Sequence, residues 1–108
     1  MKIDYEAHYD ADYFTGQKTY RAADGSTQLY HGPSLTWDGF EAVADALRLV
    51  VPGGSLLDIG CSAGDLAQRL GRRGYDAYGC DISNYAVAHA VPEMHGRLAV
   101  ADLSLIHI

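Results

Sequence analysis

Residues Leu56–Leu66 have the sequence LLDIGCSAGDL, and the rest of the chain is best interpreted around them. The run begins as a short apolar strand that carries the acidic Asp58, breaks at a glycine turn and continues as a helix. Gly60 and Gly64 bracket the turn, where missing side chains let a ligand contact bare backbone. The following helix directs free N–H groups and a partial positive charge at the same place. We therefore predict a ligand site at this turn.

The segments around this run alternate between helix and strand. Phe40, Val43, Ala44, Leu47 and Val50 form the apolar stripe of an amphipathic helix. The continuous apolar run at 55–59 predicts a strand that is covered on both faces. The expected order is helix 36–50, strand 55–59, helix 64–72, strand 75–80, helix 85–90 and strand 97–101. Such alternation predicts an α/β fold with parallel strands and right-handed crossovers.

Two regions differ in character. Residues 1–33 form a leader rich in tyrosine, aspartate and glycine without a clear period, and we expect short helical turns and loop there. Residues 34–108 hold the alternating elements. Ser34 or Thr36 is the expected cap of the first long helix, and Ser83 or Asn84 is the expected cap of the helix at 85–90.

Composition narrows the function class. Of the 108 residues, 48% are hydrophobic and 20% are charged, as in a globular protein, and the formal charge of −6 argues against nucleic acid as the main partner. The polar start is unlike a signal peptide, and no apolar run is long enough to span a bilayer. We expect a cytoplasmic protein without membrane contact. Cys61 and Cys80 lack metal-ligand spacing and are expected to be small buried thiols, with no metal site.

Three aspartates follow or end the predicted strands. Asp58 closes the first strand, Asp81 closes the second and Asp102 closes the third. In a parallel sheet these side chains emerge at the same carboxyl edge, where open α/β sheets bind ligands. Asp81 lies 21 residues after Gly60, a spacing at which an acidic residue accepts hydrogen bonds from ribose hydroxyls.

The spacing of the turn favours one class of nucleotide ligand over another. A dinucleotide fingerprint needs Gly-x-Gly-x-x-Gly, and here Ser62 stands where its second glycine would lie. Asp58, just before the turn, would repel a pyrophosphate and would suit an ammonium or sulfonium group. The site is better matched to a nucleoside that carries an amino acid than to one that carries phosphates.

These features resemble a known family. Leu56–Gly64 resembles the first motif of class I S-adenosylmethionine-dependent methyltransferases, Gly79–Ser83 the second, and Ala101–Leu103 the start of the third. Residues 9–16 and 30–33 are similar to openings of bacterial small-molecule methyltransferases of this class. The resemblance implies a Rossmann-like three-layer sandwich with parallel strands in the order 3-2-1 and flanking helices. It also implies S-adenosyl-L-methionine as cofactor and methyl transfer to a small-molecule substrate through O, N or C.

The resemblance assigns roles around the first motif. Gly60, Cys61 and Gly64 would line the methionine part of the cofactor. Asp58 would hold its ammonium group, directly or through water.

Roles in the remainder of the site follow from the other two motifs and the leader. Asp81 would bind the ribose hydroxyls and Ile82 would pack on the adenine face. Asp102 would meet the adenine amino group, with Leu103 beside it. Tyr13, or a neighbouring leader aromatic, would close over the sulfonium by a cation–π contact. No residue of the chain is assigned as the catalytic base.

The resemblance also implies a fourth strand beside the first, and the chain supplies only three. We expect a fragment whose tail, Leu103–Ile108, is either a truncated continuation or foreign sequence. Its open strand edge predicts poor solubility and weak cofactor binding. Two alternatives stay open: a fragment of an NAD(P)-dependent oxidoreductase, against which Ser62 counts, and a non-catalytic Rossmann-like binding domain.

Overall fold

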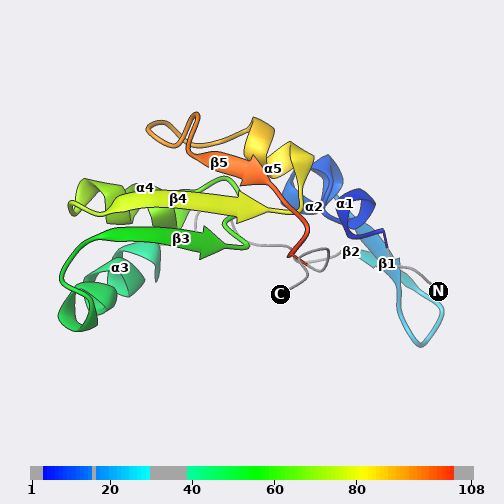
Figure 1. The fold of residues 1–108 in the computed structure, drawn as a ribbon. Helices are drawn as coiled ribbons and strands as arrows, with labels where there is room; N and C mark the ends of the chain where they lie inside the picture. Colours follow the sequence, from blue (N-terminus) through cyan, green and yellow to red (C-terminus); the bar gives the residue numbers. More distant parts are fainter. Residues whose placement is uncertain (1–3, 16, 30–38, 104–108) are drawn as a thin grey trace.

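The computed structural model describes residues 4–15, 17–29 and 39–103. Two short helices and a hairpin precede an alternating helix and strand region (Figure 1). The elements are α1 (Tyr5–His8), α2 (Ala11–Thr15), β1 (Thr19–Arg21), β2 (Thr27–Leu29), α3 (Gly39–Val50), β3 (Ser55–Ile59), α4 (Asp65–Arg72), β4 (Asp76–Asp81), α5 (Asn84–Ala88) and β5 (Leu98–Val100).

The larger sheet has three parallel strands in the order β3-β4-β5. β4 is central and pairs with β3 from Ser55↔Asp76 to Ile59↔Cys80, and with β5 from Gly79↔Leu98 to Asp81↔Val100. The predicted α/β class and parallel pairing are confirmed. The predicted helix start, Gly64, has φ of 92°, and Gly74 ends α4 in the same left-handed region, at 96°.

The helices cover one face of this sheet. The two crossovers step in the same direction, from β3 to β4 to β5, and because crossovers between parallel strands are almost always right-handed, α4 and α5 lie on the same side. Leu56, Ala77 and Leu98 pack toward them. The expectation that residues 55–59 are covered on both faces is wrong for the described residues, because Leu57 is 56% exposed and Ile59 is 61% exposed.

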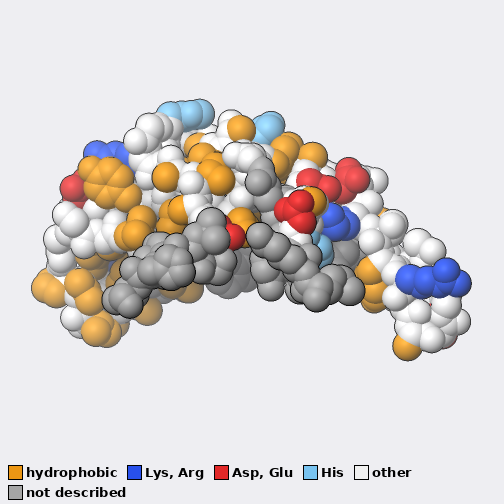
Figure 2. Space-filling model, turned by 45° about the vertical axis from the view of Figure 1, so that its right-hand side comes forward, with side chains coloured by type: hydrophobic (Ala, Val, Ile, Leu, Met, Phe, Trp, Pro, Cys, Tyr) orange, Lys and Arg blue, Asp and Glu red, His pale blue; other side chains and the backbone are white. Residues whose placement is uncertain are grey.

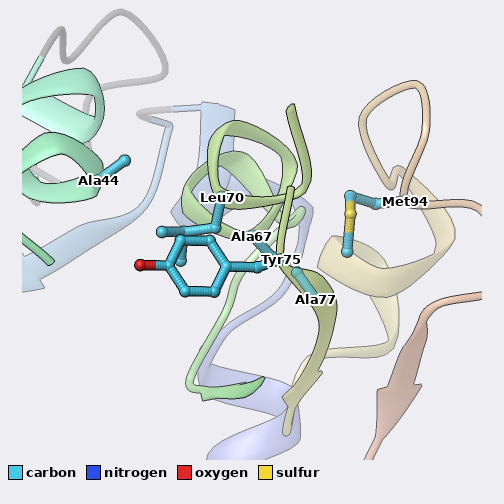
Figure 3. Close-up of a cluster of buried hydrophobic side chains, with 6 residues drawn as sticks. All are labelled: Ala44, Ala67, Leu70, Tyr75, Ala77 and Met94. Atoms are coloured by element: carbon cyan, nitrogen blue, oxygen red, sulfur yellow. The ribbon is translucent and has the colours of Figure 1, made fainter. Parts of the chain in front are cut away.

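The core is small and is built around α4 (Figure 3). The tyrosine ring of Tyr75 lies beside Leu70, and its hydroxyl donates a hydrogen bond to the Val51 carbonyl. The buried members of this cluster are Ala44, Ala67, Leu70, Tyr75, Ala77 and Met94. A core with three alanines among six members gives a modest stability margin, so it is sensitive to changes of volume.

Ion pairs connect helix α3 with α4 and the residue that follows it. Glu41 forms ion pairs with Arg69 and Arg73, and Arg73 also pairs with Asp45.

The packing of α3 on α4 buries Ala44 and partly buries Leu47. It leaves two members of the predicted apolar stripe in solvent: Val43 is 42% exposed and Val50 is 80% exposed. Those two expectations are wrong, because the helix contacts its neighbour through a narrower face than the stripe suggests.

Hydrophobic side chains consequently reach the surface over the part of the molecule that holds α3 and β3 (Figure 2). They include Leu49, Val50, Val51, Leu57 and Ile59. Within the described ranges, no helix is both long and apolar enough to cross a bilayer. The predicted caps Ser34 and Thr36, the helix start at 36–38 and the tail after Leu103 lie outside the described residues.

The leader contains an element that the sequence pattern did not suggest. Short helices were expected and α1 and α2 supply them, but β1 and β2 also form an antiparallel hairpin that projects from the body (Figure 1). Its turn is built on Asp24, whose Oδ1 accepts the Ser26 N–H at 2.9 Å, and on Gly25 with φ of 84°. An Asp-Gly pair is a strong hairpin signal only where alternating apolar residues flank it, and both strands here are exposed at every position, so the pair gave only a weak signal.

Candidate ligand-binding site

The turn after β3 is fastened to the end of β4. The N–H groups of Gly60 and Cys61 both donate to the Cys80 carbonyl, at 2.8 and 3.0 Å. Gly60 has φ of 78°, and Ser62 adopts a left-handed conformation as well, with φ of 53°. The Ser62 N–H donates to Asp81 Oδ2 at 2.8 Å. A strained non-glycine residue held in this way is typical of a functional turn.

Asp81 organises the carboxyl edge of the sheet. Its Oδ2 accepts the Ser62 N–H, its Oδ1 accepts the Ser83 N–H at 2.9 Å, and its backbone carbonyl accepts the Ala101 N–H at 2.9 Å. The residue therefore connects the segments that follow β3, β4 and β5. A carboxylate offers about four lone-pair sites, so about two remain for a ligand.

A cavity of about 410 Å³ opens at this edge. Among the predicted site residues it is lined by Tyr13, Gly60, Asp81, Ile82, Asp102 and Leu103. Tyr9 and Phe14, also in the lining, belong to the neighbouring leader aromatics that were allowed for without being named, and the lining residues that were not predicted are Ile59, Ser62, Cys80 and Ala101. Ile59, Cys80 and Ala101 each precede a predicted site residue in the chain, so their position next to it could have predicted that they line the cavity. Tyr9 and Phe14 come from the leader, where no periodicity singles them out.

Three predicted residues, Asp58, Cys61 and Gly64, are not among those that line the cavity. Gly64 is buried, and a Cβ there would lie 3.1 Å from Met94 Cγ, so the glycine serves packing and the left-handed start of α4. Cys61 is buried, and desolvation together with the charges of Asp81 and Asp58 raises the pKa of its thiol to about 12. Both cysteines are free and buried, as predicted. Asp58 is half-buried in β3.

Asp58 carries an unfavourable charge. Burial, and then the nearby charge of Asp81, raise the pKa of the Asp58 carboxyl above its usual range. Because the pKa is raised in the folded state, ionisation costs stability above the folded pKa, and this cost disappears as the pH falls toward the unfolded value. Carboxylates kept at such a cost concentrate at ligand sites.

Replacing this charge should stabilise the chain. We expect Asp58→Asn to raise the urea midpoint at a pH of about 7, and the gain to shrink at a pH of about 4, because lowering the pH through the raised folded-state pKa of Asp58 toward its ordinary value removes the cost of the charge. The measurement is urea unfolding of both proteins at the two pH values. A gain that is equal at both would contradict the electrostatic cause.

The cavity has an acidic and aromatic lining. Asp81 and Asp102 contribute carboxylates, and Tyr9, Tyr13 and Phe14 contribute an aromatic wall. No lysine or arginine is among the described residues that line it. Within the same part of the chain, no group of three or more His, Cys, Asp or Glu side chains is placed to hold a metal ion. The lining favours a neutral or cationic ligand with hydroxyl donors and disfavours phosphate.

Comparison with known proteins does not identify a family. A scan against protein-family models finds no match, and searches of curated proteins and of solved structures find none either.

Proposed function

We propose that this chain carries the cofactor-binding residues of a class I S-adenosylmethionine-dependent methyltransferase that acts on a small molecule. The observation that carries the proposal is the acidic cavity at the carboxyl ends of β3, β4 and β5, with Asp81 beside the bare backbone of the Gly60–Ser62 turn. The three sequence motifs behind the proposed family fall at the ends of these three strands.

The hydrogen-bonding capacity of the cavity suits an adenosyl group. Each carboxylate oxygen of Asp81 accepts one backbone N–H, and each can accept one more hydrogen bond. The two remaining acceptor sites match the two hydroxyls of a ribose. Gly60 has no heavy atom within 4 Å of the position of a Cβ, so its backbone stands open to a ligand. Ile82 supplies an apolar surface for a flat base, and Asp102 an acceptor for its amino group.

Charge supports the same ligand. S-adenosylmethionine supplies a transferable methyl group on a sulfonium cation. Asp81 and Asp102 in the lining, and Asp58, whose charge interacts with that of Asp81, stabilise positive charge, and they oppose the pyrophosphate of a dinucleotide. Tyr13 offers its ring to the sulfonium as a cation–π partner.

On this proposal the described residues bind and orient the ligand, and catalysis comes mainly from positioning. The proposal also accounts for the exposed face of the sheet. A Rossmann-like three-layer domain has a further strand beside β3 and a second helix layer over Leu57 and Ile59, which are exposed here. On the same proposal the methyl group passes to an O, N or C atom of a small-molecule acceptor, and the reaction takes place in the cytoplasm.

The test is a titration of the ¹⁵N-labelled chain, followed by amide chemical shifts, with S-adenosylhomocysteine and separately with NAD⁺. This method detects weak binding, which we expect. S-adenosylhomocysteine should shift the amides of Gly60, Ser62 and Ile82, and leave the exposed hairpin residues Thr19–Leu29 unchanged. Larger shifts with NAD⁺ at the same amides would favour an oxidoreductase fragment, and shifts confined to other regions would overturn the proposed site.

A further inference from the structure

Ser83 lies at the junction of three segments that border the cavity. It is the N-cap of α5, where its hydroxyl oxygen accepts the Ala86 N–H at 3.1 Å. Its own N–H donates to Asp81 Oδ1 at 2.9 Å. Its hydroxyl donates to the carbonyl of Tyr9, 74 residues earlier in the chain. The residue is fully buried.

Two of these three hydrogen bonds involve the Ser83 hydroxyl, which donates one and accepts the other. A hydroxyl has one hydrogen to donate, and here Tyr9 receives it, while the cap uses the oxygen as acceptor. An N-cap needs only the acceptor, so the bond to Tyr9 is additional to capping. Because Tyr9 lines the cavity, the donated bond fixes a point of the leader beside it.

A second contact supports the same docking. Phe14 is buried and stacks on Tyr85, with ring centroids 5.9 Å apart and an angle of 20° between the planes. Tyr9 and Tyr13 lie edge to face at 4.8 Å, and Tyr13 contacts Phe14 in the same manner at 5.0 Å. The three aromatic residues of the wall therefore form one continuous set of ring contacts, which Ser83 joins at Tyr9 and Tyr85 joins at Phe14.

We infer that Ser83 is a positioning residue for the adenosyl ligand: its hydroxyl holds the leader against α5, so that Tyr9, Tyr13 and Phe14 close one side of the cavity. The ligand named here rests on the proposed function. The backbone N–H of Ser83 also orients the Asp81 carboxylate, which is proposed to accept the ribose hydroxyls. Ser83 therefore links this carboxylate to the aromatic wall. Releasing the leader opens the cavity to water and leaves the Asp81 contact in place.

The experiment compares Ser83→Ala, Ser83→Thr and Ser26→Ala with the wild type. Ser83→Ala removes the donor, Ser83→Thr keeps a hydroxyl, and Ser26→Ala makes the same chemical change in the exposed hairpin turn. Hydrogen exchange of the Phe14 amide, measured without ligand, reports leader docking. Exchange of the α5 amides reports the cap separately. Chemical-shift titration with S-adenosylhomocysteine gives the affinity.

Ser83→Ala should abolish protection of the Phe14 amide and weaken binding of S-adenosylhomocysteine about tenfold, the effect of losing one buried hydrogen bond. Ser83→Thr should restore both, and Ser26→Ala should change neither. Retained Phe14 protection in Ser83→Ala overturns the inference, as does unchanged affinity. If the wild type binds no S-adenosylhomocysteine while Phe14 protection still depends on Ser83, the tether is supported and the ligand assignment fails.

Discussion

Gly79→Ala should lower the stability of this chain by about 3 kcal/mol, enough to lower the melting temperature by about 10 °C or more. Gly79 is buried in β4, the central strand. An added Cβ would lie 2.7 Å from both Cβ and Sγ of Cys61 and 2.9 Å from Cδ2 of Leu98. Cβ atoms essentially never approach another atom so closely, so the neighbours on both sides would have to move.

Those neighbours have little freedom to move. Cys61 is 5% exposed, and its N–H is committed to the Cys80 carbonyl. Leu98 is paired with Gly79 itself across the β4–β5 ladder. A shift of Cys61 would displace the Gly60–Ser62 turn, so the substitution should also impair the ligand site. A buried glycine within a strand is here the consequence of close approach between neighbouring segments.

A matched control is available in α4. Gly71 has no heavy atom within 4 Å of an added Cβ, and it is exposed inside the helix. Gly71→Ala should therefore stabilise the chain by up to about 1 kcal/mol through helix propensity. Urea unfolding followed by far-ultraviolet circular dichroism measures both variants. An unchanged midpoint for Gly79→Ala would show that the sheet accommodates the methyl group and that the packing argument is wrong.

The part of the site that follows from strand topology was predictable. Alternating helices and strands imply parallel pairing, and parallel pairing brings the carboxyl ends of the strands to one edge. Asp81 and Asp102 accordingly line one cavity. Gly64 shows the limit of such reasoning. The sequence around a turn glycine does not distinguish a glycine that faces a ligand from one that, as here, packs against Met94.

Features that depend on distant segments were not predictable. The apolar run at 55–59 has the same pattern whether one face or both are covered, and the exposure of Leu57 and Ile59 reflects which elements pack on the sheet. The aromatic wall depends on a bond between Tyr9 and Ser83, which no local periodicity encodes. Ser62 contributes its backbone N–H to Asp81, so its side-chain chemistry gave no signal.

Removal of the Asp81 carboxylate should have the largest effect on ligand binding. Asp81→Asn replaces one acceptor oxygen with a donor that opposes either the Ser62 or the Ser83 N–H, and it leaves one oxygen for the ligand. Asp81→Ala leaves both N–H groups without their acceptor, so it should also destabilise the turn. We expect about 100-fold weaker binding of S-adenosylhomocysteine in Asp81→Asn, because hydrogen bonds to a charged group are lost.

A general loosening of the turn would also weaken binding, so the decisive comparison varies the ligand. Wild-type protein should bind adenosine more tightly than 2′,3′-dideoxyadenosine, since only adenosine donates ribose hydroxyls to Asp81. In Asp81→Asn this preference should largely vanish, whereas a purely structural role for Asp81 would leave it intact. Asp76→Asn, at the opposite end of β4 and paired with Arg97, makes the same substitution outside the cavity and should keep the preference. Equal binding of the two nucleosides by the wild type would remove Asp81 as the ribose acceptor.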